Sequence, residues 1–377
     1  MPNVQKMRAI EDWLLIGLFL VALVAPLVAM AIIPGQSTSS DEYRTLASRP
    51  ALPKTVTELV KFPRRFGLYF NDHFGFREPL VRLQALVKVK GLGGSVTPQV
   101  IVGKDGWLFL DPDHDPSLSQ SRSDKPFTGE QLARWQQALQ VRHDWLAQRG
   151  IRYLFVIAPE KQSVYPEYLP DNRRYLQTSR FDQLVAYVRK NSQLEILDLR
   201  PPLLEAKQSR RLYFKTDTHW DALGGLVAYQ AIVKDLAKYF PEMKPVQESD
   251  CVTYTRVLST GDLARIMGLN GWFAEEVEGI QLRNPGFVAQ VEVNGPNWML
   301  VSTHRDQNLP RLLAFCDSFS SAFATFLSQH FSRAVYRPQL YFDPGQVELE
   351  RPQIVMQEMV ERYLSDDPPP DLLPARK

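Results

Sequence analysis

The stretch "RYLFVIAP", residues 152–159, decides the fold class of this 377-residue chain. It is a short apolar run that ends at a proline, which is typical of a strand buried on both faces of a sheet. A helical pattern comes just before it. Thr128 and Gln131 have the spacing of a capping box, and apolar residues then recur at near-helical spacing from Leu132 until Gly150, a natural helix stop. The chain is therefore predicted to run from a helix directly into a buried strand.

The same alternation continues along the rest of the chain. Helical spacing and apolar runs follow one another in the order helix 181–188, strand 194–199, helix 222–240, strand 311–318, strands near Val335 and Val355, and a last helix over 358–364. Strands separated by helices of this length predict an α/β fold with a mainly parallel sheet flanked by helices. Such folds place their chemistry at the carboxyl ends of the strands.

The N-terminal region predicts a membrane anchor. Residues 13–33 carry no charge, and about 20 such residues suffice for a transmembrane helix. A cleaved signal, suggested by the small residues Ala29 and Ala31, is the alternative, but the run exceeds the usual signal core of about 7 to 15 residues. Lys6 and Arg8 then keep residues 1–12 in the cytoplasm. We expect a single-pass inner-membrane protein with its folded domain in the periplasm.

The remaining boundaries follow from composition. Serine and proline in the segment after the anchor predict a linker over 34–65, and a proline-rich, charged end predicts a disordered tail over 366–377. The folded domain is expected over 66–365. The chain has 44 basic and 42 acidic residues, so its charge gives no reason to expect a nucleic-acid partner. Cys251 and Cys316 could pair in an oxidising compartment, but they fit no zinc ligand spacing.

The stretch "FKTDTHWD", residues 214–221, is the first candidate for catalysis. Asp217 and His219 lie two positions apart at the start of a predicted helix. A carboxylate that accepts from one imidazole nitrogen fixes the tautomer and leaves the other nitrogen free as a base. The alternative is that Thr216 or Asp217 caps the helix and that His219 is an ordinary surface histidine.

The second candidate is "LLAFCDSFSSAF", residues 312–323. An apolar strand runs into Asp317 and Ser318, where a serine hydroxyl can project and the amides of the next helix start can donate to a developing oxyanion. Here too the alternative is a helix cap, made by Asp317, Ser318 or Ser320. The two segments together supply Asp, His and Ser, and such a triad needs no metal or cofactor. Cys316 is a less favoured nucleophile, because cysteine at an apolar strand end is usually inert.

Three further residues are candidates for substrate binding. Lys161 and Tyr165 follow a predicted strand on the side where ligands bind, and Trp220 could stack on a sugar ring. The competing interpretations are a polar loop that merely covers the sheet and a tryptophan that packs beside the histidine.

Several ordered motifs resemble one family. The chain is similar to the SGNH hydrolase-like alginate O-acetyltransferases, the AlgJ and AlgX proteins, from about Phe66 to Leu364. The motifs are "VGKDGWLFL" (102–110), "APEKQSVYPEYLP" (158–170), "TDTHW" (216–220), "GDLARIMGL" (261–269), "CDSFS" (316–320) and "ERYL" (361–364).

The resemblance implies an SGNH-like fold and acetyl transfer onto hydroxyls of an exopolysaccharide such as alginate. Ser318 would be the nucleophile, His219 the general base and then acid, and Asp217 the orienting carboxylate. It also implies a membrane-bound O-acyltransferase as the acetyl supplier, and the anchor favours the AlgJ type. One departure is Cys316, where many relatives have glycine. A carbohydrate acetylesterase and a catalytically silent scaffold of a polysaccharide acetylation complex are the alternatives.

Overall fold

The computed structural model describes residues 2–32, 37–39, 44–91, 93–111, 114, 125–171, 178–294 and 297–371. The chain divides into two compact units, one of Met1–Val96 with Arg265–Asn270 and one of Thr97–Ala264 with Gly271–Lys377. The larger unit thus begins at Thr97, whereas the sequence predicted a domain start at residue 66.

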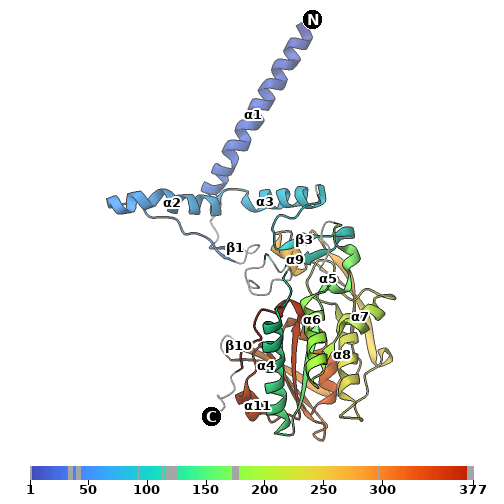
Figure 1. Cartoon of the computed structure of the whole chain (residues 1–377). Helices are drawn as coiled ribbons and strands as arrows, with labels where there is room; N and C mark the ends of the chain where they lie inside the picture. The colour runs from blue at the N-terminus through green and yellow to red at the C-terminus, as the bar shows by residue number, and fades with distance from the viewer. Residues whose placement is uncertain are drawn as a thin grey trace. The chain divides into compact units, whose positions relative to one another are not determined.

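The smaller unit is helical. Helix α1 (Pro2–Ile32) contains the stretch Glu11–Ile32, which is long and apolar enough to cross a membrane. Helices α2 (Val56–His73) and α3 (Arg77–Leu86) follow a two-residue pairing of β1 (Thr38–Ser39) with β2 (Arg44–Thr45) (Figure 1). Helix α2 begins inside the expected linker because the Thr55 side chain caps it, accepting from the Glu58 N–H. Residue 33 of the expected anchor and residues 34–36 and 40–43 of that linker lie outside the described residues.

The larger unit contains a seven-stranded sheet in the order β6-β5-β13-β11-β12-β10-β9. The five strands from β6 to β12 pair in parallel, while β10 pairs antiparallel with both β12 and β9. The predicted α/β fold with a mainly parallel sheet is confirmed, and two antiparallel strands extend one edge. The strands are β5 (Arg152–Ala158), β6 (Ile196–Asp198), β9 (Phe287–Asn294), β10 (Asn297–His304), β11 (Arg311–Cys316), β12 (Arg333–Pro338) and β13 (Ile354–Val360).

Helices cover both faces of this sheet (Figure 1). Along β5, Leu154 and Val156 face a core shared with α8, whereas Phe155 and Ile157 face a second core shared with α4 and α6. The continuous apolar run of β5 is explained by this burial on both sides. The helices of this region are α4 (Gly129–Ala147), α5 (Lys161–Val164), α6 (Arg180–Asn191), α7 (Arg200–Ala206), α8 (Ala222–Leu236), α9 (Asp262–Ile266), α10 (Ala324–Leu327) and α11 (Pro344–Glu350).

Three parts of the larger unit differ from the expectation. The helix predicted over 358–364 is wrong, because β13 continues to Val360 and only a 3₁₀ turn at Glu361–Tyr363 follows. Two hairpins were not predicted: β3 (Val100–Val102) with β4 (Leu108–Leu110), and β7 (Cys251–Leu258) with β8 (Glu275–Leu282).

The described part of the expected disordered tail, residues 366–371, packs on the domain. Asp371 pairs with the fully buried Arg142 of α4, and Asp366 pairs with Arg180 of α6. The Pro369 carbonyl also accepts from Arg142. These charged residues order the segment by neutralising two largely buried guanidinium groups. Residues 372–377 lie outside the described residues.

Candidate active site

The loop before α8 carries Asp217 and His219. The N-cap of α8 is Asp221, whose Oδ1 accepts from the backbone N–H groups of Leu223 and Gly224 at 3.0 Å. The alternative that Thr216 or Asp217 caps this helix is therefore wrong. Asp217 is left free for a different partner.

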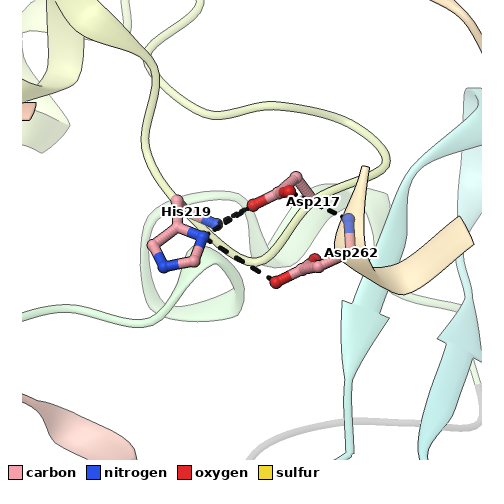
Figure 2. Close-up of side chains that lie close together, drawn as sticks. All are labelled: Asp217, His219 and Asp262. Carbon is pink, nitrogen blue, oxygen red and sulfur yellow. Dashed lines mark hydrogen bonds and ion pairs between the residues drawn. The ribbon is translucent and has the colours of Figure 1, made fainter. Parts of the chain in front are cut away.

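Asp217 orients His219. Its Oδ1 lies 2.7 Å from the imidazole Nδ1 and also accepts from the His219 backbone N–H at 3.0 Å. Its Oδ2 accepts from the backbone N–H of Asp262 at 2.9 Å, so both carboxylate oxygens are engaged (Figure 2). With Nδ1 facing a carboxylate, the proton sits on Nδ1 and Nε2 is free to accept.

Ser318 completes the arrangement, although it lies 99 residues after His219 in the chain. It follows β11 at the first position of the 3₁₀ turn η7 (Ser318–Ala322), and Asp317, not Ser318 or Ser320, caps that turn by accepting from the Phe319 N–H at 2.9 Å. Ser318 is exposed, whereas Asp317 and Phe319 on either side of it are buried. The Ser318 Oγ lies 2.7 Å from His219 Nε2. The structure thus brings together the three residues that the sequence singled out.

The ionisation of the pair follows from this geometry. Burial acts against charge on both groups, but the hydrogen bond and charge of Asp217 raise the pKa of His219 above its usual value. The same bond and the His219 charge lower the pKa of Asp217 to about 2 against the effect of burial. Asp217 therefore stays a carboxylate and stabilises the imidazolium that a proton transfer would create.

Asp262 is a site residue that the sequence did not assign. Its Oδ2 lies 3.8 Å from His219 Nδ1, and its carboxylate accepts from the Thr218 N–H at 2.7 Å and the Thr218 hydroxyl at 2.5 Å. Its "GDLARIMGL" motif pointed to the family but gave no role. Asp217, His219 and Asp262 offer ligand atoms within 4.8 Å of one another, the grouping that could hold a metal ion. Their hydrogen bonds to one another and to Thr218 already account for this grouping.

Gly261 lets the Asp262 loop approach the Asp217 loop. A Cβ at this position would overlap the Thr216 carbonyl and lie 2.6 Å from the Asp217 backbone nitrogen. Real side chains do not tolerate such contacts with backbone atoms. The site therefore requires glycine here, because the close approach of the two loops allows the Asp262 N–H to donate to the Asp217 carboxylate.

Three residues were predicted to bind substrate, and the structure shows them buried below the site and bonded to its backbone: Lys161, Tyr165 and Trp220. Lys161 is 1% exposed and donates to the carbonyls of Phe214, Lys215 and Asp217 at 2.6 to 3.1 Å. Burial lowers the pKa of Lys161 to about 8, opposed by the acidic groups around it.

The other two residues are equally enclosed. Tyr165 accepts from the Leu212 N–H, and Trp220 donates through Nε1 to the Phe319 carbonyl at 3.0 Å. Trp220 thereby ties the histidine loop to the serine turn. Substrate contact by these three residues stays a prediction; in the structure their polar atoms are buried against the protein's own backbone.

Two more buried groups lie under the serine turn. The Glu358 side chain of β13 accepts from the Asp317 N–H at 3.2 Å, and Asp317 Oδ2 accepts from the Val360 N–H at 2.7 Å. Burial and the charge of Asp317 raise the pKa of Glu358 well above its usual value. These bonds fix the end of β11 to β13 directly beneath Ser318.

Arg362 supplies a positive charge close to the same turn. It pairs with the buried Glu160, and its guanidinium carbon lies 5.3 Å from the centre of the Phe319 ring. Burial alone would lower the pKa of Arg362, but the charges of Glu160 and Asp317 outweigh this effect. The pKa is raised above its usual value, so the group stays charged. The residue follows β13 directly, at a position expected in the sequence to be helical.

The hydrogen bonds that the amides near Ser318 already make determine which amide is free to stabilise an oxyanion. The Phe319 N–H is bonded to the Asp317 side chain, and the Ser320 N–H is bonded to the Asp317 carbonyl. The expectation that the amides after Ser318 serve this role is therefore wrong. Within the part of the chain that the structure describes, the Ser318 N–H has no partner.

Cys316 does not compete with Ser318. It is 2% exposed, its Sγ lies 3.6 Å from the Arg337 carbonyl oxygen, and burial raises the pKa of the thiol well above its usual value. A protonated, enclosed thiol is a poor nucleophile. Cys251 and Cys316 are both free and buried, so the pairing that an oxidising compartment would allow is not formed.

Comparison with known proteins identifies the family to which this domain belongs. The family model "SGNH hydrolase-like domain, acetyltransferase AlgX" matches residues 100–373. The chain belongs to this AlgX family. The match includes every residue of the site and confirms the SGNH-like assignment of the α/β domain.

Relatives of this AlgX-family chain carry the name "Probable alginate O-acetylase AlgJ". The protein from Pseudomonas syringae pv. tomato is 29% identical over 220 residues, which are 57% of this chain and 52% of the relative. The protein from Pseudomonas putida is 33% identical over 144 residues, 37% of this chain and 34% of the relative. The chain therefore spans about half the length, or less, of these curated relatives. Bacillus cereus PatB1 shares the fold, with a TM-score of 0.54 and 15% identity over 71% of this chain and 97% of PatB1.

Proposed function

We propose that this AlgX-family chain is an O-acetyltransferase that carries an acetyl group on Ser318 and passes it to a hydroxyl of an exopolysaccharide such as alginate. The observation that carries the proposal is the continuous hydrogen-bonded series from Asp217 through His219 to the exposed Ser318 hydroxyl. The names of the AlgJ relatives support the choice of an acetyl group and of alginate as the acceptor.

The first half-reaction loads the serine. His219 Nε2 takes the proton of Ser318 as Oγ attacks the acetyl carbonyl of the donor, and the Ser318 N–H donates to the oxyanion. The intermediate collapses when the bond between the acetyl carbon and the donor oxygen breaks, and the imidazolium returns its proton to that oxygen. Acetyl-Ser318 and the free donor alcohol result.

The second half-reaction transfers the group. A sugar hydroxyl gives its proton to His219 Nε2 and attacks the acetyl-serine carbonyl. The Ser318 Oγ then leaves and regains the proton from the imidazolium. Asp217 remains ionised throughout and keeps Nδ1 in place.

We also propose where the reaction takes place. Helix α1 would anchor the chain in the inner membrane, and the larger unit would act in the periplasm on acetyl groups supplied by a membrane-bound O-acyltransferase. The apolar length of α1 supports the anchor. Exposure of Ser318 on the surface of the larger unit suits an acceptor that is a polymer.

The test is mass spectrometry of the full chain in detergent after incubation with p-nitrophenyl acetate. We expect one acetyl adduct at Ser318 that is absent from Ser318→Ala and His219→Ala, with acetyl release lowered at least about a thousandfold. Ser321→Ala is the matched control, because Ser321 is exposed on the same turn but bonds only to the Ser318 carbonyl.

Two outcomes would change the assignment. No adduct and no released acetate in the unaltered chain would indicate a scaffold protein. An adduct that yields acetate but no acetylated sugar, even with an excess of alginate oligosaccharide, would indicate an acetylesterase.

A further inference from the structure

Helix α2 has an apolar face on which Leu59 and Phe66 are exposed and Phe62 and Phe70 are half-buried in the described chain. Leu59, Phe62, Phe66 and Phe70 recur at three- and four-residue spacing and therefore share one side of the helix. The Phe62 and Phe66 rings are 6.0 Å apart and the Phe66 and Phe70 rings 6.2 Å apart, both stacked. They form a continuous row of aromatic rings along the helix.

This face is accessible. None of the α2 residues is buried, and Leu59 and Phe66 are 59% and 45% exposed. A row of exposed aromatic and aliphatic side chains is costly in water and marks a surface that meets an apolar partner.

The opposite face of α2 is basic. Lys61, Arg64 and Arg65 lie on this side at 100° per residue, are exposed, and form no ion pair with the described residues. The acids of the helix are used elsewhere, since Glu58 accepts from the Lys54 N–H and Asp72 from the Ala47 N–H. The helix therefore offers three exposed cations on the side opposite its apolar face, and their long side chains can extend toward the headgroups along the flanks of the helix.

We propose that α2 lies in the surface of an anionic lipid bilayer. The apolar row would enter the boundary between headgroups and acyl chains, and Lys61, Arg64 and Arg65 would meet lipid phosphates. The combination of an apolar face with a basic one suits a lipid surface, which offers acyl chains and negative headgroups together. Helix α1, long enough to span a bilayer and joined to α2 by residues 33–55, holds α2 near such a surface.

The experiment measures the depth of α2 in the membrane. Full chains with Phe66→Cys or, as the matched control, Thr57→Cys on the polar side are labelled with an NBD maleimide and reconstituted in phosphatidylethanolamine–phosphatidylglycerol vesicles. The native Cys251 and Cys316 are 4% and 2% exposed, so the label goes to the new cysteine, and labelled unaltered chain gives the background. Leu59→Cys provides a second reporter on the apolar face.

We expect the probe at residue 66 or 59 to shift to the blue and to be quenched by lipids with a doxyl group at acyl carbon 5. The probe at residue 57 should instead be quenched by iodide in the water. Omitting phosphatidylglycerol, or combining Lys61→Gln, Arg64→Gln and Arg65→Gln, should reduce the doxyl quenching at residue 66 at least twofold.

Equal iodide quenching at residues 57, 59 and 66 would overturn the proposal. Protection of residue 66 without doxyl quenching, increasing with protein density, would also overturn it, because a second copy of the chain would then cover the face. The readout involves no acetyl transfer, so its outcome is independent of whether the proposed chemistry at Ser318 holds.

Discussion

Among single residues, Asp217 determines the pH range in which His219 can act as a base. A general base must be neutral, so activity should fall as the pH decreases through the His219 pKa, which lies above its usual 6.5. In Asp217→Asn the negative charge that raises this pKa is lost, while burial still lowers it. The acid limb of kcat/KM should therefore move to lower pH, and kcat should fall by about 10³ to 10⁴.

The pH profile of p-nitrophenol release between pH 5 and 9 checks this expectation. Asp262→Asn is the comparison, because Asp262 is 3.8 Å from His219 Nδ1 and contributes less to its pKa than Asp217 does. Its acid limb should move less. An unchanged limb in Asp217→Asn would show that Asp217 does not control the imidazole.

Lys161 is expected to matter for alignment of the loop that carries the proposed catalytic residue Asp217. Lys161→Met would leave three buried carbonyls of the 214–217 loop without their donor, which should lower the free energy of unfolding by about 3 kcal/mol. It should also lower kcat more than KM, because the loop carries Asp217.

Chemical denaturation and steady-state kinetics measure the two effects. The control is Lys104→Met, where an exposed lysine pairs with the exposed Asp171 and its loss should cost less than about 1 kcal/mol. Equal stability of the two variants would contradict the role given to Lys161.

At the level of elements, two loops must come into contact for the triad to form. Gly261→Ala places a methyl group against the Thr216–Asp217 backbone and should push the loop before α9 away. Small displacements of this kind cost about a hundredfold in rate, so kcat/KM should fall by that order. Gly129→Ala at the start of α4, where the new methyl group meets no atom within 4 Å, should leave acetyl release unchanged. Equal activity of both variants would show that the loop accommodates the side chain.

The elements also show what sequence patterns can and cannot reveal. Helix α4 and strand β5 were predicted because a capping box and a continuous apolar run are local signals. The strand β13 was cut short in the prediction because Glu358 is polar, although it is fully buried and accepts from the Asp317 N–H. The pairing of β7 with β8 was missed because β7 is largely exposed and neither strand carries a long apolar run.

In the candidate site too, residues in short local patterns were predictable and residues brought in from distant segments were not. Asp217 and His219 are two residues apart, and Ser318 follows a buried strand, so short stretches carried all three. Asp262, Glu358 and Arg362 reach the site through contacts between distant segments, which spacing along the chain does not encode. The assignment of Lys161 rested on its place after a strand, where a polar side chain can face either a ligand or a backbone carbonyl. That of Trp220 rested on its ring, which can either stack on a sugar or pack inside the protein.

At the scale of the whole molecule, residues 366–371 bind across α4 and α6. Asp371→Asn would leave the buried Arg142 without its carboxylate and should lower the free energy of unfolding by about 2 kcal/mol. Asp367→Asn should cost less than about 1 kcal/mol, because its partner Arg134 is 40% exposed. Thermal unfolding of the two variants shows whether residues 366–371 stabilise the domain or are only loosely attached to it. Identical melting temperatures would indicate the latter.

The position of β13 has a consequence for the order in which the domain is made. This strand pairs with β5 and β11 in the middle of the sheet, yet it is the last strand in the chain. While the chain emerges during synthesis, β5 and β11 have an empty place between them, and each presents an unpaired edge. The sheet closes only after residue 360 has emerged. A domain completed last by a central strand can stay unfolded until most of its chain has been made, which would suit the export proposed above.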